Sequence, residues 1–574
     1  IFMKGIAGQF LKDFAITIVF STLFSLWVAM TLTPMVMAQV HYEKAPSSLE
    51  RKMTSWWIGP YNRFEAGHRS FVKGTLQYPY VTISFFICLF LFCLFLIPRL
   101  GVEFIPKVDR GVMEITLELP SDASLTYTEK ITGEVERYLR FLPSVEAVEV
   151  AVGGSGSETG VNRSRLRVLL TDDPHRPSSF MLAEQLRGYL NSIPDVRSSI
   201  SASVSGGGSP GKPIQIIVSG ESIETLNIIA FQVVDIMKET SNVVDVDTNW
   251  RLGRAEYRIS PVSWRLGYLG LTTEAVVDTV RNYITGTKAG IFREEGKEYD
   301  ILTILDPLHA DAIAKIQDFP LPFREEFIPL SSVVDLSYGT GPTSILRSDR
   351  NRAITISANV NNRSVGDAFA KIQKRVQDIS LPQGYKFSFA GEVEDIKENF
   401  AYLYSAFAMS VILTFLMIAA ILESYLFALI IMITLPLSAI GVIPILFITR
   451  TAVSLYGLLG MIMLVGLVVN NAIIIIDYGE KRRKEGIEPF KAIQEACAVR
   501  LRPIVMADLT SIIAMLPLAL GLGEGGPYRA PMAIVSIGGL VAGGTLALFA
   551  VPPIYILSWR FRYWFHERRT STSV

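Results

Sequence analysis

Seven long apolar runs constrain this chain more than any other feature of its sequence. Each run is about 19–25 residues long, enough for an α-helix to cross a hydrocarbon core of ~30 Å. They lie at roughly 14–38, 80–98, 400–422, 427–449, 454–477, 503–522 and 532–557. The runs predict a polytopic α-helical protein embedded in a lipid bilayer. The mean hydropathy of +0.35 agrees with this class.

Charge and composition exclude several other classes. The chain carries 54 Lys+Arg and 54 Asp+Glu, and this neutral balance argues against nucleic acid as a partner. Its three cysteines indicate neither a disulfide framework nor a metal site. The five histidines show no metal-ligand spacing; they are His41, His68, His175, His309 and His566. No nucleophile motif stands out either. We therefore expect that the chain is not an enzyme and has no catalytic residues, no metal and no cofactor.

The distribution of Lys and Arg predicts the orientation of the chain. These residues concentrate in the loops 39–79 and 478–502 and in the tail 559–574. Short loops rich in Lys and Arg stay in the cytoplasm, and counting spans places all three segments on that side. The long soluble stretch after the second run then lies outside the cytoplasm. The same count puts Ile1 outside, so we expect an N-terminal portion to be missing from this chain.

The first cytoplasmic segment has the composition of an interfacial helix. Residues 47–75 mix aromatic and basic residues without a long apolar run. This pattern predicts a helix in the membrane interface, with Trp56, Trp57 and Tyr61 at headgroup depth. An ordinary cytoplasmic connector is the alternative interpretation.

The outer stretch, 99–398, alternates strand-like and helix-like segments. Strands are predicted at 112–119, 145–152, 164–170, 198–205, 214–219, 352–358 and 386–390, and helices at 125–142, 179–193, 223–240 and 365–379. Repeated βαβ units of this size predict small, ferredoxin-like α+β sandwiches. The part at 247–344 is richer in short strands and Pro-containing loops, which indicates an inserted subdomain.

A Gly-rich stretch at 206–213 imitates a nucleotide-binding loop. It matches the start of the motif GxxxxGK, but Pro213 stands where Ser or Thr must bind Mg²⁺. A strand-like segment follows instead of a helix, so no helix N-terminus would bind phosphate. We interpret the stretch as a linker, and we expect no site for ATP hydrolysis in this chain.

Polar side chains interrupt two of the apolar runs at similar depth. Asn470 and Asn471 lie ~10 Å from the cytoplasmic end of one run, and Asp508 lies ~8 Å into the next. An acid there costs at least ~2.5–3.5 kcal/mol on insertion scales and usually faces the bundle interior. Burial disfavours a charged carboxylate, so such an acid can exchange a proton near neutral pH. With Thr510 and Ser511, these residues form a candidate proton pathway.

Each of these polar residues also has a purely structural interpretation. The asparagines can hold neighbouring helices together. Asp508 can extend toward the interface or cap a cytoplasmic turn. Gly539 and Gly543, four residues apart, fit helix packing.

Several motifs are similar to those of resistance-nodulation-division (RND) efflux permeases. The resemblance spans essentially the whole chain and favours the hydrophobe/amphiphile branch. It rests on ITIVFSTLFSLWVAMTLTPM (16–35), GVEFIPKVDRGVMEITLELPSDAS (101–124), ILESY (421–425), VGLVVNNAIIIIDY (465–478), RLRPIVMADLTSIIAMLPLALGLGEG (500–525) and VSIGGLVAGGTLALFAVPPIY (535–555). The chain resembles the C-terminal half of such a permease, from its sixth span onward.

The resemblance implies a proton-driven antiporter in a bacterial inner membrane, exporting small molecules. It implies a homotrimer with a periplasmic adaptor and an outer-membrane channel, and a partner N-terminal half. The implied parts are a sixth span at 1–38, a cytoplasmic interfacial helix and linker at 39–79, a span at 80–98, a periplasmic porter region at 99–246, a docking subdomain at 247–344, a continued porter region at 345–398, a five-span bundle at 399–558 and a cytoplasmic tail at 559–574.

The chain departs from the multidrug members within the membrane. Asn470 stands where they have a Lys in the tenth span, and Ala507 stands where they have a Thr. The paired aspartates of the family belong to the fourth span, which this chain lacks. Asp508 is therefore an unusual addition: either the relay runs differently in this protein, or Asp508 substitutes locally in it.

A second departure concerns the substrate. Multidrug members line a gating loop with phenylalanines, whereas the corresponding loop here consists of Gly153, Gly154, Ser155, Gly156 and Ser157. Such a loop offers flexibility and hydroxyls but little apolar area for a drug. No Met or Cys cluster favours soft metals either. Alternatives to a transporter are a non-transporting scaffold or sensor with the same fold, or an inactive truncated product.

Overall fold

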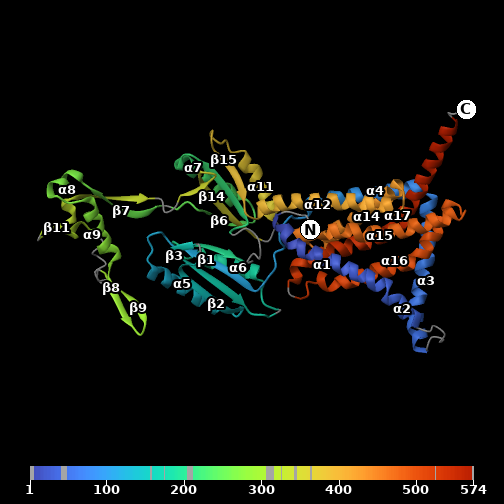
Figure 1. Ribbon diagram of the computed structural model, residues 1–574, viewed down its shortest axis with the longest axis horizontal. Helices are drawn as coiled ribbons and strands as arrows, with labels where there is room; N and C mark the ends of the chain where they lie inside the picture. The colour runs from blue at the N-terminus through green and yellow to red at the C-terminus, as the bar shows by residue number, and fades with distance from the viewer. Residues whose placement is uncertain are drawn as a thin grey trace.

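The computed structural model describes most of the chain and shows an elongated molecule (Figure 1). A helical bundle forms one end, and α+β units extend from it toward the other end. The described residues are 5–39, 48–155, 158–173, 175–202, 211–251, 253–304, 316–324, 326–341, 345–361, 365–523 and 525–571.

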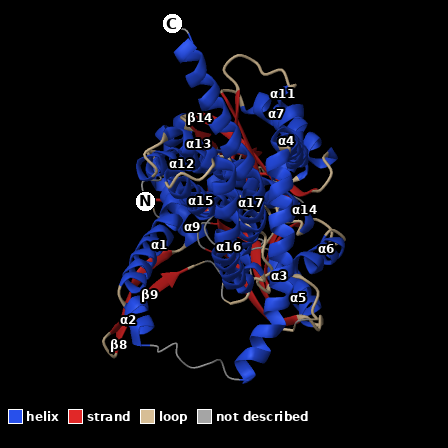
Figure 2. Cartoon of the chain, turned by 90° about the vertical axis from the view of Figure 1, so that its right-hand side faces the viewer, coloured by secondary structure: helices blue, strands red, loops and turns tan. Residues whose placement is uncertain are grey.

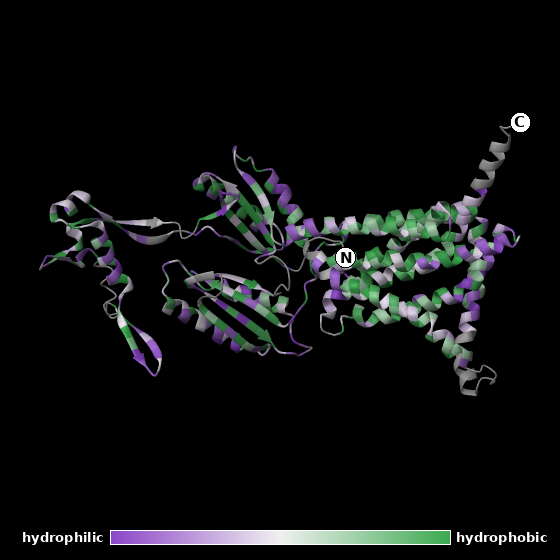
Figure 3. Ribbon diagram, viewed as in Figure 1, coloured by the Kyte–Doolittle hydropathy of each residue, from purple (hydrophilic) through white to green (hydrophobic). Residues whose placement is uncertain are grey.

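Seven helical segments of the described residues are long and apolar enough to cross a membrane, in agreement with the seven predicted runs. Hydrophobic residues dominate this end of the molecule (Figure 3). The helices are α1 (Gly5–Met30) with α2 (Leu32–Gln39), α4 (Pro79–Leu96), α12 (Glu392–Ile421), α13 (Tyr425–Met432) with α14 (Thr434–Ile448), α15 (Leu455–Lys484), α16 (Pro489–Ala519) and α17 (Gly526–Ser571). The last helix continues without a break through most of the predicted tail.

Glycines on α17 let the central helices approach closely. A Cβ at Gly543 would lie 2.6 Å from the Val468 side chain of α15, and one at Gly539 would overlap Leu464. The packing role predicted for these two glycines is confirmed. On the α14 side, Gly538 and Gly441 face each other so closely that a Cβ at Gly441 would overlap the Gly538 carbonyl oxygen. Seen from the end of the bundle, α15 and α17 lie at its centre (Figure 2).

We expect Gly441→Ala to destabilise the protein by about 1–3 kcal/mol, because overpacking a tight contact forces strain or displacement. The added methyl group would meet backbone of α17, which cannot yield as a flexible side chain would. The melting temperature of the purified protein in detergent measures the effect. Gly466→Ala is the matched control, since a Cβ there has nothing within 4 Å. Equal melting temperatures for the two variants would contradict the prediction.

The predicted interfacial segment forms one long helix, α3 (Ser48–Gln77), which crosses the end of the bundle (Figure 1). Val72 and Leu76 are buried in a core shared with α15, α16 and α17. The side chains of Trp56 and Trp57 lie outside the described part of the structure. The second half of α3 is thus amphipathic and packs against other helices of the bundle.

The first α+β unit has the order βαββαβ. It consists of β1 (Val112–Glu118), α5 (Leu125–Arg140), β2 (Val145–Ser155), β3 (Glu158–Leu170), α6 (Ser179–Leu190) and β4 (Arg197–Ser201). Its antiparallel sheet has the strand order β2-β3-β1-β4. Ser124 and Ser178 cap the two helices by accepting hydrogen bonds from backbone N–H groups in the first turn. Alternate residues of β1 are buried against these helices.

The second unit repeats this order. It consists of β5 (Ile214–Gly220), α7 (Ile223–Glu239), β6 (Val243–Thr248), β14 (Asn351–Val360), α11 (Val365–Gln377) and β15 (Lys386–Ala390). In its sheet β14 lies beside β5 and β5 beside β15, while β6 and the short β13 (Leu346–Ser348) pair with different parts of β14. The order β6-β14-β5-β15 is therefore equivalent to β2-β3-β1-β4.

A further subdomain is inserted between β6 and β14, at the end of the molecule far from the bundle (Figure 1). Its base is the pair β7 (Arg254–Pro261) and β12 (Val334–Gly341). The other elements are α8 (Ser263–Leu269), α9 (Thr273–Thr285), β8 (Thr287–Glu294), β9 (Lys297–Thr303), β10 (Pro320–Phe323) and β11 (Glu326–Pro329), with short 3₁₀ turns at Ile316–Asp318 and Leu330–Ser332. It occupies the position at which the first unit has only the β2–β3 turn.

The expected strands and helices of both units are found close to the predicted bounds, and an α+β domain on a helical membrane bundle is confirmed. The Gly-rich stretch falls partly on residues 203–210, outside the described residues. Strand β5 begins at Ile214, so a strand rather than a helix follows the Gly-rich stretch, in agreement with its interpretation as a linker.

Candidate functional site

The structure joins two of the predicted polar residues within the bundle. The Asn471 amide nitrogen on α15 donates to both carboxylate oxygens of Asp508 on α16, at 2.9 and 3.0 Å. Asn471 is 3% exposed, and Asp508 is partly buried. The two residues meet because α15 and α16 are neighbours joined by a short turn, which brings residues at similar distances from that turn together.

A third helix completes the surroundings of the carboxylate. A Cβ at Gly544 of α17 would overlap an Asp508 carboxylate oxygen and lie 3.2 Å from the Asn471 amide nitrogen. The acid therefore occupies space that exists because α17 has no side chain there. The sequence analysis missed Gly544; the adjacent glycines 543 and 544 were the available signal.

The other three predicted pathway residues do not join this pair. Asn470 is exposed. Successive residues of a helix point about 100° apart, so Asn470 points away from the bundle when Asn471 points into it. Thr510 is also exposed, and its hydroxyl donates to the Met506 carbonyl of its own helix at 2.7 Å. Ser511 is partly buried, one turn beyond Asp508. It is thus Asn471, rather than the residue at the family's lysine position, that contacts the acid.

The predicted gating loop is largely a continuation of two strands. Gly154 pairs with Thr159 and Ser155 with Glu158 in the β2–β3 hairpin, and the register shifts at Gly153. Gly153 has φ +90°, a conformation that glycine adopts readily. The expectation of a free loop from residue 153 is wrong, because backbone pairing extends through Ser155. Gly156 and Ser157 lie outside the described residues.

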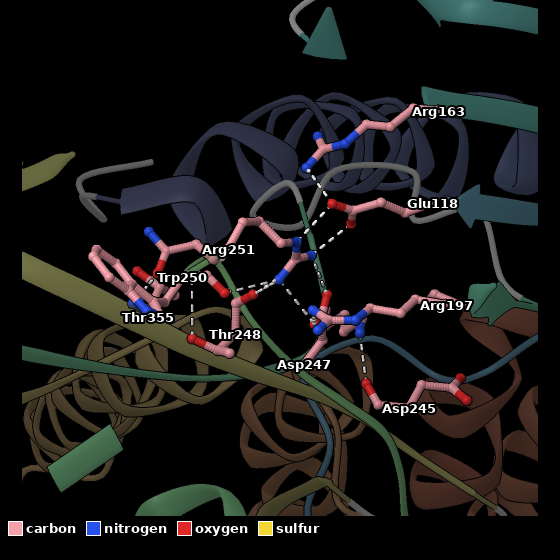
Figure 4. A network of polar contacts seen from close by, with 12 residues as sticks. Glu118, Arg163, Arg197, Asp245, Asp247, Thr248, Trp250, Arg251 and Thr355 are labelled. Carbon is pink, nitrogen blue, oxygen red and sulfur yellow. Dashed lines mark hydrogen bonds and ion pairs between the residues drawn. The ribbon is translucent and has the colours of Figure 1, made fainter. Parts of the chain in front are cut away.

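A network of charged residues joins the two α+β units (Figure 4). Arg251, which follows β6, donates to both carboxylate oxygens of Glu118 at the end of β1, each at 2.6 Å. The same guanidinium pairs with Asp247 at 2.9 Å. The side chains of Arg251 and Glu118 are 15% and 14% exposed. Burial raises the pKa of Glu118, but the hydrogen bonds and charge of Arg251 outweigh it and hold that pKa below its usual range.

A second ion pair joins the units nearby. Arg187 of α6 contacts Asp245 of β6 at 3.2 Å, and the Asn359 amide of β14 donates to the same carboxylate at 2.9 Å. Sequence reasoning missed both pairs. Their partners are 58 and 133 residues apart, and charged residues on strand edges give no signal of which charge they will meet.

Two copies of one α+β unit carried on a bundle of apolar helices, each long enough to cross a membrane, are the architecture of a multi-pass membrane protein. The sequence itself shows to which family of membrane proteins the chain belongs. The model of the AcrB/AcrD/AcrF family matches residues 1–558, and the chain belongs to this family of RND efflux permeases. The resemblance to RND permeases is thereby confirmed, and membership of a transporter family is compatible with the expectation that the chain is not an enzyme.

Two solved structures share the fold, and both are crystal forms of a heavy metal efflux pump. Form II matches with a TM-score of 0.78 and 19% identity, over 87% of this chain and 51% of that one. Form I matches with a TM-score of 0.78 and 20% identity, over 88% of this chain and 52% of that one. The chain thus spans about half the length of these structures. The likeness does not single out the hydrophobe/amphiphile branch.

Proposed function

We propose that this chain is the C-terminal half of an RND-type secondary transporter that exports small molecules by proton antiport. The observation that carries the proposal is the Asn471–Asp508 pair between two apolar helices. An acid buried in a membrane bundle usually belongs to an ion or proton pathway. Family membership supports the export of a cargo, and the pair supplies a group that can bind a proton.

In this mechanism Asp508 takes up and releases the proton, while Asn471 positions it. The Asn471 amide cannot titrate, so it donates to the ionised carboxylate without taking the proton itself. When Asp508 is protonated, the amide loses part of this charge-assisted contact, and the α15–α16 contact changes with it. Asn470, Thr510 and Ser511 remain candidate members of the pathway, facing parts of the relay beyond this chain.

The proposed topology places the basic segments in the cytoplasm and the α+β units in the periplasm of a bacterial inner membrane. The segments 99–246 and 345–398, which contain both units, then form the porter region, and 247–344 forms the docking subdomain toward an outer-membrane channel. The complete protein would act as a homotrimer with a periplasmic adaptor. Exposed aromatic side chains on the inserted subdomain, such as Trp264 and Tyr268, support a docking role.

We further propose an organic cargo and the hydrophobe/amphiphile branch. Among the described residues of the outer domain, Met113 and Met237 are buried in the separate cores of the two units and Met181 is exposed on α6, so no two of these sulfurs share a core in which they could bind one metal ion. The predicted gating loop, residues 153–157, would contact the cargo through backbone and hydroxyl groups. This cargo would therefore be more polar than the drugs bound by phenylalanine-lined pockets.

Deletion of the gene for the full-length protein, followed by growth tests against drugs, bile salts, solvents and metals, tests the function and identifies the cargo class. We expect sensitivity to at least one organic class, relieved by the full-length gene, and an efflux that stops when a protonophore is added. Residues 1–574 alone should not restore resistance. Unchanged sensitivity to every class would favour a scaffold or sensor, and sensitivity to metals alone would overturn the proposed branch.

A further inference from the structure

The short segment 101–107 connects the membrane bundle to the outer domain and contacts several elements of both. On the membrane side it pairs with the residues before α15: the Val453 N–H donates to the Gly101 carbonyl at 2.8 Å, and the Glu103 N–H donates to the Val453 carbonyl at 3.1 Å. On the outer side, the Gly366 N–H of α11 donates to the Val102 carbonyl at 3.2 Å. The junction segment 101–107 is thus one of two chain connections between the bundle and the outer domain, the other being the passage from β15 into α12.

Two charged side chains reinforce the junction segment. Glu392, the first residue of α12, accepts a hydrogen bond from the Phe104 N–H at 3.0 Å. The Lys107 ammonium donates to the Val360 carbonyl at the end of β14, at 3.1 Å. Helix α12 follows directly from β15 through Gly391, so Glu392 lies where the second unit enters the membrane. Phe104 itself is 1% exposed, within a core formed with α12 and α15.

Glu103 occupies this junction among charges that compete with one another. Burial, together with the negative charge of Glu392, raises its pKa to about 7, against the opposing positive charge of Lys107. Burial lowers the pKa of Lys107. The negative charges of Glu392 and Glu103 raise this pKa, and the positive charge of Arg187 on α6 lowers it. Asp395 is buried one turn further along α12. Val453, just before α15, and Leu455, the first residue of α15, contribute backbone groups.

We propose that Glu103 is a protonatable positioning residue, whose proton decides how firmly the junction segment holds the outer domain to α12 and α15. With Glu103 protonated, the charges of Lys107 and Glu392 balance, and both keep their backbone hydrogen bonds. With Glu103 ionised, two carboxylates compete for one ammonium group, and like charges repel. The junction is therefore tightest when periplasmic protons are plentiful. As a role in transport, this inference rests on the proposed proton antiport.

Hydrogen exchange of the peptide containing Phe104, in the full-length protein between pH 5 and 8.5, tests the proposal. The closed junction binds the proton with a pKa of about 7, and the opened segment has the ordinary value of 4.5. Because the closed state holds the proton more tightly, protection is greatest at low pH. After correction for intrinsic exchange, it should fall by about 10-fold per pH unit and level off above pH 7.

Three variants separate this coupling from a merely structural role. Glu103→Gln should lose the pH dependence while keeping protection at pH 8. Lys107→Met removes the opposing charge and should move the levelling-off to higher pH. Glu394→Gln, an exposed acid in the first turn of α12, should behave as the unaltered protein does.

Protection that is independent of pH in the unaltered protein, or unchanged by Glu103→Gln, would overturn the inference. This readout needs no cargo and no proton flux. A protein that shows the exchange pattern but no proton-driven efflux would therefore refute the proposed function while leaving the proton-dependent junction in place.

Discussion

Asp508→Asn in the full-length protein should reduce efflux to the level of cells without the gene. The substitution keeps the size of the side chain and a hydrogen-bonding oxygen for the Asn471 amide, but it removes the group that can bind and release a proton. The geometry around Gly544 accommodates an amide of the same shape, so the protein should still accumulate in the membrane. Efflux of the cargo identified by growth tests, measured in cells, gives the result.

Met506→Leu is the matched control for this variant. Met506 lies two residues before Asp508 on the same helix, its side chain is 59% exposed, and it is not a member of the candidate pathway. We expect efflux close to that of the unaltered protein. Full efflux by Asp508→Asn would show that Asp508 is not an essential proton carrier and that its contact with Asn471 serves helix packing alone.

Glu118→Gln should have the largest effect on the stability of the outer domain, a loss of about 3–5 kcal/mol, as expected when one partner of a buried ion pair is removed. The variant removes Glu118 from the Arg251 guanidinium and leaves it with Asp247 at the unit boundary. Arg251→Met combined with Glu118→Gln should recover part of the loss, because the buried guanidinium is then removed as well and Asp247, whose side chain is 33% exposed, keeps access to water. Thermal unfolding of the four proteins in a double-mutant cycle measures the coupling.

The pair Glu256 and Arg258 provides the comparison within the same chain. Their side chains are 45% and 58% exposed, and the ion pair lies within one strand. Exposed pairs contribute about 0–1 kcal/mol, so Glu256→Gln should change the melting temperature little. Equal shifts for Glu118→Gln and Glu256→Gln would show that the buried pair does not hold the units together. Arg251 holds the pKa of Glu118 low despite burial. The contribution of this ion pair to the free energy of unfolding is therefore present at neutral pH and is lost on acidification.

Local pattern was sufficient to predict most of the elements. The strand β1 alternates buried and partly exposed residues, and helix α5 is amphipathic and capped by a serine, so each carries its own signal. The apolar length of the spans is an equally local property. The extension of β2 and β3 through Ser155 was not predictable in this way, since it depends on cross-strand pairing of residues with weak strand propensity.

The candidate site was predicted in part. Counting residues from the turn between the two runs put Asn471 and Asp508 at one depth, because helical rise converts sequence position into depth. Which of the two asparagines faces the acid depends on the rotation of α15 about its axis. That rotation is set by packing against α17, through contacts such as Gly543 with Val468.

By itself, the sequence determined the seven apolar helices, the repeated α+β units and the family, because hydrophobic length, periodicity and motifs are properties of contiguous residues. Only the tertiary structure decided that Asn471 and Gly544 enclose Asp508, that Arg251 and Glu118 join the two units, and that Glu103 lies among competing charges. These arrangements bring together residues distant in the chain. Their energies arise from burial and charge pairing, which exist only once the helices and sheets have packed.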